Sequence, residues 1–129
     1  MRIGELAEAS GTKTKTLRFY EEAGLLPTPE RTPAGYRDYN AQTLPRLDFI
    51  RRGRAAGLSL NQIRGVLGIR DSGTPPCQHV QDLLGRRLAD LDRQISDLQA
   101  LRESVAHLRD AAKTIDPGCC DPTTICRYL

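Results

Sequence analysis

The chain has 129 residues, of which 39% are hydrophobic and 27% charged, with a formal net charge of +3. No apolar run approaches the roughly 18 residues of a membrane span, and the opening MRIGELAEAS lacks the basic and apolar regions of a signal peptide, so we expect a cytoplasmic protein with no membrane contact. With two Phe, four Tyr and no Trp, the core would be thin, which predicts a partner chain that buries further surface.

The charge is unevenly distributed along the chain. Residues 1–70 carry 12 Lys and Arg against 7 Asp and Glu, whereas residues 71–129 carry 7 against 9. A basic half suits a phosphate-binding face, provided that the same half contains a nucleic-acid-binding motif.

The first two predicted elements are short helices. The segment IGELAEAS (3–10) has apolar residues at helical spacing, and Gly11 is a natural stop. Thr12 is then placed to cap a second helix, KTKTLRFYEEAG (13–24), which turns Leu17 inward. Two short helices joined by a glycine-containing turn outline a helix-turn-helix, whose second helix enters the major groove of DNA.

A proline-rich hairpin is predicted next. The segment LLPTPERTPAGYRDYN (25–40) cannot be helical, and its ends suit extended backbone around Tyr36 and Tyr39. Arg31 and Arg37 flank it, where an arginine-rich wing beside a recognition helix would grip phosphates. Taken alone, the segment is equally typical of a solvated loop.

Two packing helices follow the hairpin. In AQTLPRLDFIRRGRAAG (41–57), Pro45 is tolerated if it lies in the first turn, and Phe49 is expected in the core. In SLNQIRGVLGIR (59–70), Ser59 is a predicted cap. The segment DSGTPP (71–76) then breaks the chain into two parts.

A single long helix is predicted between Pro76 and Pro117. Its apolar positions recur at steps of three and four, and about 36 helical residues would be on the order of 54 Å long. Such a stripe is typical of a coiled coil with a second copy of the chain, with an intramolecular helical hairpin as the alternative. The stripe comprises Val80, Leu84, Leu88, Leu91, Ile95, Leu98, Leu101, Val105, Leu108 and Ala112.

Three of the four cysteines lie in the final stretch, GCCDPTTICRYL (118–129). In a reducing compartment, clustered cysteines favour metal binding or redox sensing over structural disulfides. Asp116-Pro117-Gly118 would end the long helix, and Asp121-Pro122 would start a short one in which Cys126 faces back toward Cys120. Thiolates select Zn(II), Cd(II), Pb(II) or Hg(II) over Mg(II), Ca(II) or Mn(II).

The stretch IGELAEASGTKTKTLRFYEEAGLLPTPERTPAGYRDYNAQTLPRLDFIRRGRAAGLSLNQIRGVL resembles the DNA-binding region of the MerR family of transcription regulators. The long helix and cysteine tail resemble that family's metal-sensing branch. The resemblance implies a mainly α-helical fold with a winged helix-turn-helix domain (1–70), a dimerisation helix in an antiparallel coiled coil (75–113), and a metal-binding loop with a short C-terminal helix (114–129).

The resemblance also implies a function and its residues. Members of the family bind double-stranded promoter DNA as homodimers and distort it for RNA polymerase when the inducer binds. The implied inducer is a divalent thiophilic ion (Zn, Cd, Pb or Hg), bound by Cys77 of one protomer with Cys119 or Cys120 and Cys126 of the other. The implied DNA contacts are Lys15, Arg18 and Tyr20 on the second helix, Arg31, Tyr36 and Arg37 in the wing, and Arg54 on the following helix.

Several alternatives remain open from the sequence. Copper(I)-sensing relatives lack a cysteine at the head of the dimer helix, so Cys77 favours a divalent ion, while His79, Asp116 and Asp121 are further candidate ligands. An iron–sulfur or thiol redox sensor of the same fold is disfavoured because Cys77 lies far from the tail cysteines. A metal carrier would not need the wing, and no catalytic motif indicates an enzyme.

Overall fold

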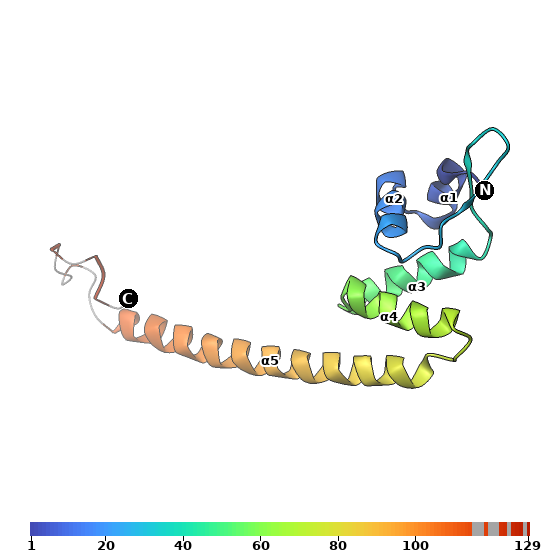
Figure 1. The fold of residues 1–129 in the computed structure, drawn as a ribbon. Coiled ribbons are helices and arrows are strands. Elements are labelled where there is room, and N and C mark those ends of the chain that lie inside the picture. The colour runs from blue at the N-terminus through green and yellow to red at the C-terminus, as the bar shows by residue number, and fades with distance from the viewer. Residues whose placement is uncertain (115–117, 119–121, 124, 128) are drawn as a thin grey trace. The chain divides into compact units, whose positions relative to one another are not determined.

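The computed structural model describes residues 1–114, 118, 122, 123, 125–127 and 129, and it confirms a mainly α-helical fold with a winged helix-turn-helix. The chain divides into two compact units, Met1–Arg87 and Leu88–Leu129. The elements, labelled in Figure 1, are α1 (Ile3–Ser10), α2 (Thr14–Glu22), β1 (Glu30–Arg31), β2 (Arg37–Asp38), α3 (Thr43–Ala55), α4 (Leu60–Asp71) and α5 (Cys77–Lys113).

The turn between α1 and α2 differs in one detail from the sequence prediction. Gly11 adopts the left-handed conformation (φ 67°) and ends α1 as expected. The cap of α2 is Lys13, without a side-chain hydrogen bond, so the prediction that Thr12 caps this helix was wrong. Thr12 lies in the turn one residue before the cap, and its N–H donates to Ser10 Oγ at 3.3 Å.

The wing is a two-stranded antiparallel hairpin, as predicted. Glu30 lies opposite Asp38, and Arg31 lies opposite Arg37. At the tip, Gly35 has φ 87°, which favours glycine, and its N–H donates to the Thr32 carbonyl at 2.8 Å. This tight turn fixes the register of the hairpin.

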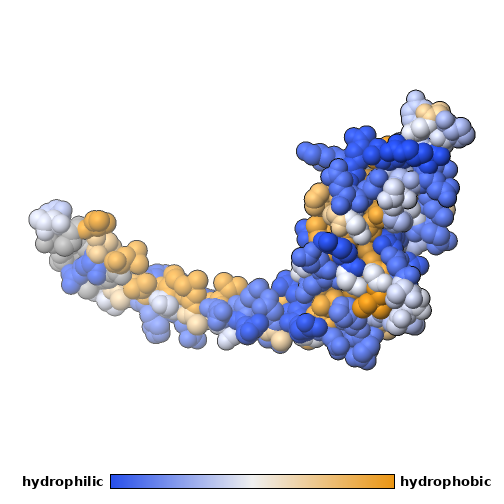
Figure 2. Space-filling view, in the orientation of Figure 1, coloured by the Kyte–Doolittle hydropathy of each residue, from blue (hydrophilic) through white to orange (hydrophobic). Residues whose placement is uncertain are grey.

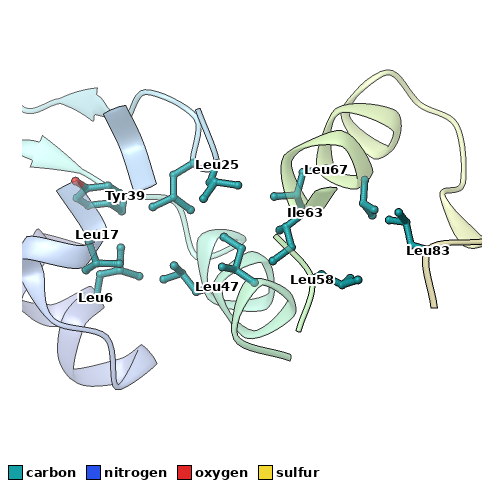
Figure 3. Close-up of a cluster of buried hydrophobic side chains, with 12 residues drawn as sticks. Leu6, Leu17, Leu25, Tyr39, Leu47, Leu58, Ile63, Leu67 and Leu83 are labelled. Atoms are coloured by element: carbon teal, nitrogen blue, oxygen red, sulfur yellow. The ribbon is translucent and has the colours of Figure 1, made fainter. Parts of the chain in front are cut away.

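One hydrophobic core unites all the elements of the first unit except the two strands themselves (Figure 3). Leu83 of α5 belongs to it, which explains why this compact unit extends to Arg87, beyond the predicted domain limit at residue 70. Phe49 is only half-buried and packs against the edge of the core. The buried apolar residues are Leu6, Leu17, Leu25, Leu26, Tyr39, Leu47, Ile50, Leu58, Ile63, Val66, Leu67 and Leu83.

Helices α3 and α4 begin as the sequence predicts. Pro45 lies in the first turn of α3, where its missing N–H has no intrahelical acceptor. Ser59 caps α4 by accepting a hydrogen bond from the Gln62 N–H at 3.1 Å, and the Gln62 side chain accepts from the Ser59 N–H at 2.9 Å. This reciprocal capping box satisfies two of the free donors at the helix start.

Helix α5 is one uninterrupted element of 37 residues, which corresponds to a length of about 55 Å. It ends at Lys113, and Asp116 and Pro117, expected to stop it, lie outside the described residues. The predicted short helix near Cys126 is absent from the part of the tail that the structure describes, where Pro122 and Thr123 form a turn. A helix that short has too few hydrogen bonds to form without packing against another element.

No helix within the described ranges is both long enough and apolar enough to cross a membrane. This agrees with the charged residues distributed along α5, among them Asp82, Arg93 and Arg109.

Candidate nucleic-acid interface and cysteine positions

Helix α2 presents its basic side chains on the side opposite to the core. Leu17 is fully buried, whereas Lys15 and Arg18 are exposed. Tyr20 is half-buried and packs against the core, and its backbone carbonyl accepts hydrogen bonds from Leu25 and Leu26. The two cations of α2 are therefore available to a ligand. Much of the Tyr20 side chain is instead used in packing against the core.

The wing and α2 together form a basic hollow. It has a volume of about 190 Å³ and is lined by Arg18 of α2 and by Arg31, Tyr36 and Arg37 of the wing, together with the start of α1. The structure thus brings four of the seven predicted DNA-contact residues to one place. Lys15 and Arg54 are exposed on α2 and α3 but are not part of its lining.

A carboxylate of α2 fastens the wing to that helix. Glu21 Oε2 accepts a hydrogen bond from the Tyr39 hydroxyl at 3.0 Å and lies 3.4 Å from Arg37 Nε. Burial of the Tyr39 ring raises the pKa of its hydroxyl above the ordinary 10.0, and the hydrogen bond to Glu21 raises it further. Tyr39 therefore stays neutral and donating over the whole physiological range.

Sequence reasoning missed one cation of the hollow, Arg2. This residue precedes α1, yet its guanidinium carbon lies 4.5 Å from the centroid of the Tyr36 ring, and its side chain lines the same hollow. Arg2 and Tyr36 are 34 positions apart in the chain. The only available signal was a positive charge immediately before the first helix, which does not indicate a contact with the wing.

The described cysteines lie at the two ends of the α5 segment. Cys77 is the first residue of α5, Cys126 follows the helix in the tail, and both are exposed and free of disulfides. Cys119 and Cys120 lie outside the described residues. Within the part of the chain that the structure describes, no group of three or more His, Cys, Asp or Glu side chains gathers as a metal site.

The histidine near Cys77 packs toward α4. His79 is half-buried, and its Nε2 lies 4.0 Å from the position that a Cβ on Gly65 would take. The imidazole is thus placed against the backbone of α4, two residues after the cysteine. Asp116 and Asp121, the other candidate ligands, lie outside the described residues.

Comparison with known protein families identifies the family of this chain. Residues 1–68 match the family described as MerR HTH family regulatory protein, and residues 44–108 match the one described as MerR, DNA binding. The chain belongs to the MerR family. It is therefore a regulator of transcription and not an enzyme.

Three relatives show how far the MerR likeness extends. The mercuric resistance operon regulatory protein of Bacillus cereus is 40% identical over 84% of this chain and 83% of its own length. The transcriptional regulator ZntR of Escherichia coli K12 is 38% identical over 85% and 79%. The crystal structure of the regulator PbrR691 from Ralstonia metallidurans CH34, in complex with lead(II), matches with a TM-score of 0.76 and 39% identity over 85% of each chain.

Proposed function

We propose that this chain is a metal-responsive transcription activator, which binds promoter DNA as a homodimer and responds to Zn(II), Cd(II), Pb(II) or Hg(II). The observation that carries the metal response is the exposed, unpaired Cys77 at the first position of α5, with Cys126 in the segment after that helix. Similarity to a mercuric resistance regulator and to a regulator crystallised with lead(II) supports the same class of inducer.

The DNA-binding half of the proposal is supported by the basic hollow. Exposed cations on α2 and in the wing would contact the phosphate backbone, with α2 directed into the major groove. Such contacts position the protein on the duplex, while the base sequence is read by other groups or by the shape of the DNA. Lys15, Arg18, Tyr20, Arg31, Tyr36, Arg37 and Arg54 are the proposed DNA-contacting set.

Dimerisation is supported by the apolar side chains that α5 leaves exposed. Leu88, Leu98 and Leu101 are 61%, 65% and 59% exposed, Ile95 and Val105 are more than half exposed, and Leu108 is 38% exposed. Figure 2 shows these hydrophobic side chains along the surface of α5. A helical stripe of this length is the signature of a coiled coil, so a second copy of α5 is the proposed cover.

An antiparallel arrangement would explain the cysteine positions. A helix of about 55 Å separates Cys77 from the tail in sequence, so one chain has little means of joining them. In an antiparallel pair, the start of one helix lies beside the end of the other. Cys77 of one protomer would then share a site with Cys120 and Cys126 of the second copy, and Cys119 would be a neighbouring donor.

The donor set fits the proposed ions. Thiolates prefer soft or borderline cations, and the described residues add no carboxylate cluster that would favour Mg(II) or Ca(II). When bound, the ion would supply a bridge between two chains. Each protomer would contribute the thiolates that hold it.

The first turns of α5 contact the core of the DNA-binding unit, so a movement of the helix at Cys77 would be transmitted to that unit. Leu83 is buried in the core, and Arg87 Nε donates to the Ala56 carbonyl in the α3–α4 turn at 3.2 Å. The adjacent Gly57 has φ 87°, and a Cβ there would lie 2.5 Å from Arg87 Nε. A metal that reorients α5 at Cys77 would therefore move the turn that supports α3 and α4, and promoter distortion for RNA polymerase is the proposed consequence.

The decisive experiment is anaerobic titration of the reduced protein with Zn(II), Cd(II), Pb(II), Hg(II) and Cu(I). Each titration is run in competition with a chelator and followed by thiolate absorption, alongside transcription from the protein's own promoter. Tight binding of a divalent ion, activation by that ion, and loss of both in Cys77→Ser are the expected results. Cys119→Ser is the matched control, because its neighbour Cys120 remains.

The opposite outcome is equally clear. If Cu(I) alone activates, and Cys77→Ser behaves as the wild type, the site consists of tail cysteines only. The assignment of a divalent inducer would then be wrong, while the DNA-binding role would stand.

A further inference from the structure

We propose that the basic hollow binds one phosphate of the DNA backbone, and that Arg2, held on the ring of Tyr36, is a direct ligand of that phosphate. The inference rests on the proposed DNA binding and adds to it a residue outside the helix-turn-helix and the wing. It is carried by the position of the Arg2 guanidinium, 4.5 Å from the Tyr36 ring centroid, in the lining of the hollow.

The four arginines of the hollow differ in how far other protein groups already engage their guanidinium groups. Arg37 Nε lies 3.4 Å from the Glu21 carboxylate, which offsets part of its charge. Arg31 Nη1 donates to the Gly35 carbonyl at 2.9 Å, which fixes its guanidinium at the tip of the wing. Among the described residues, no carboxylate lies within ion-pair distance of Arg2 or Arg18, so these two are the cations most available to an anion.

The Tyr36 ring is placed by the turn that precedes it. Its backbone N–H donates to Thr32 Oγ1 at 3.2 Å, and its carbonyl accepts from the Thr32 N–H at 2.7 Å. A guanidinium that lies over an aromatic face keeps the N–H groups on its edge free. The stack therefore orients Arg2 without using the donors that a phosphate would need.

The backbone holds the beginning of the chain against the wing. The Tyr39 N–H donates to the Met1 carbonyl at 2.6 Å, next to strand β2. The residue after Met1 is thereby brought alongside the wing, which explains how Arg2 reaches Tyr36. A phosphate in the hollow would then be contacted from α2, from the wing and from the segment before α1.

The test uses binding to a DNA duplex of about 30 base pairs of arbitrary sequence, because a phosphate contact is independent of sequence. Affinity is measured by fluorescence anisotropy between about 50 and 200 mM NaCl. Each lost phosphate contact lowers the slope of log K against log salt by about 0.9. Arg2→Ala and Arg2→Gln are each expected to lower the slope by about that amount, whereas Arg2→Lys keeps the charge and the slope.

Two controls separate the site from general electrostatics and from folding. Arg86→Ala removes the same charge from an exposed position of α5 that is not in the hollow, and it should leave the slope unchanged. Glu5 accepts from the backbone N–H of Arg2 at 3.4 Å, so substitution of the Arg2 side chain retains that contact at the start of α1. Unchanged thermal unfolding of Arg2→Gln confirms that the fold is intact.

The role of the ring is tested by combination. Tyr36→Leu should lower the affinity for the duplex. Arg2→Ala should then lower that affinity less in the Tyr36→Leu protein than in the wild type, because the Arg2 guanidinium has already lost the ring that orients it. If Arg2→Ala and Arg2→Gln keep the full slope while Arg18→Ala lowers it, Arg2 is not a phosphate ligand although DNA binding stands. If the wild-type protein does not bind the duplex at low salt, the proposed function itself fails.

Discussion

Arg46 joins three segments of the first unit through a single buried guanidinium. Its Nε donates to the Leu25 carbonyl at 2.6 Å, and Nη1 and Nη2 donate to the two carboxylate oxygens of Asp71 at 2.8 and 3.0 Å. The hydrogen bonds from Arg46 lower the pKa of Asp71 below its ordinary 3.8, and partial burial opposes that shift. This residue therefore connects the loop after α2, helix α3 and the last residue of α4.

Asp71→Asn should weaken the fold in a pH-dependent way. The pKa of Asp71 is lower in the folded than in the unfolded protein. The ionised carboxylate therefore contributes fully to the free energy of unfolding above the unfolded pKa, and this contribution is lost as pH falls through the folded pKa. The side chain is 54% exposed, so we expect a loss of less than about 1 kcal/mol near neutral pH. Urea unfolding of both proteins at about pH 7 and about pH 3 measures it.

Asp97→Asn, at an exposed position of α5, is the control for that experiment. The difference between wild type and Asp71→Asn should shrink as pH falls. A difference that is equally large at both pH values would show that the ionised carboxylate of Asp71 does not stabilise the fold.

At the scale of the element, most of this fold could be predicted from local sequence. Apolar periodicity and turn residues indicated each of the five helices in the described part of the chain and the hairpin, because such elements depend mainly on residues a few positions away. The cap of α2 was predicted one residue too early, because the helix begins at Thr14 and the residue before it is Lys13, whose side chain makes no capping hydrogen bond. The contact between Arg2 and Tyr36 depends on tertiary structure and could not be predicted.

The two predicted caps provide a direct comparison of helix starts. Ser59 accepts a hydrogen bond from the Gln62 N–H, whereas Thr12 is not the cap of α2. Ser59→Ala should lower the free energy of unfolding by about 1 kcal/mol, and Thr12→Ala should lower it by less. Chemical denaturation of the two variants under identical conditions is the measurement, and an equal loss in both would contradict the capping role of Ser59.

At the scale of the whole molecule, a single chain leaves a large apolar surface of α5 exposed. Within the described part of α5 the buried residue is Leu83, in its second turn. Five later positions of the stripe are more than half exposed: Leu88, Ile95, Leu98, Leu101 and Val105. Leu98, Leu101 and Val105 also line a surface hollow of about 400 Å³ together with Arg102, Ala106 and Arg109. A globular monomer rarely leaves so continuous an apolar surface in water, which is the physical argument for a second copy.

The proposed placement of the metal site also depends on that second copy. Cys77 could be recognised from its position before a long helix, and the structure confirms that it opens α5 and is exposed. In the proposed antiparallel dimer, which cysteines meet is set by two chains, and no pattern in one sequence determines it. The proposal therefore links the metal response to the dimer, and a variant that separates the chains should affect both.

Leu101→Asp places a charge in the middle of the exposed stripe and should convert the dimer to monomers. A carboxylate buried between two helices would lose hydration without gaining a partner, which costs more than a coiled-coil contact contributes. Sedimentation equilibrium measures the mass, and the same sample is titrated with Cd(II). Monomers should bind Cd(II) more weakly, because the thiolates of two chains no longer meet.

Ser96→Asp is the matched control, since it adds the same charge about 200° around the helix from Leu98, away from the stripe. It should remain dimeric and keep the wild-type affinity for Cd(II). Loss of the dimer in both variants would mean that added charge, and not position in the stripe, decides association. A monomeric Leu101→Asp that binds Cd(II) as tightly as the wild type would place the whole metal site within one chain, and Cys77 could then contribute only if the tail of its own chain reached it.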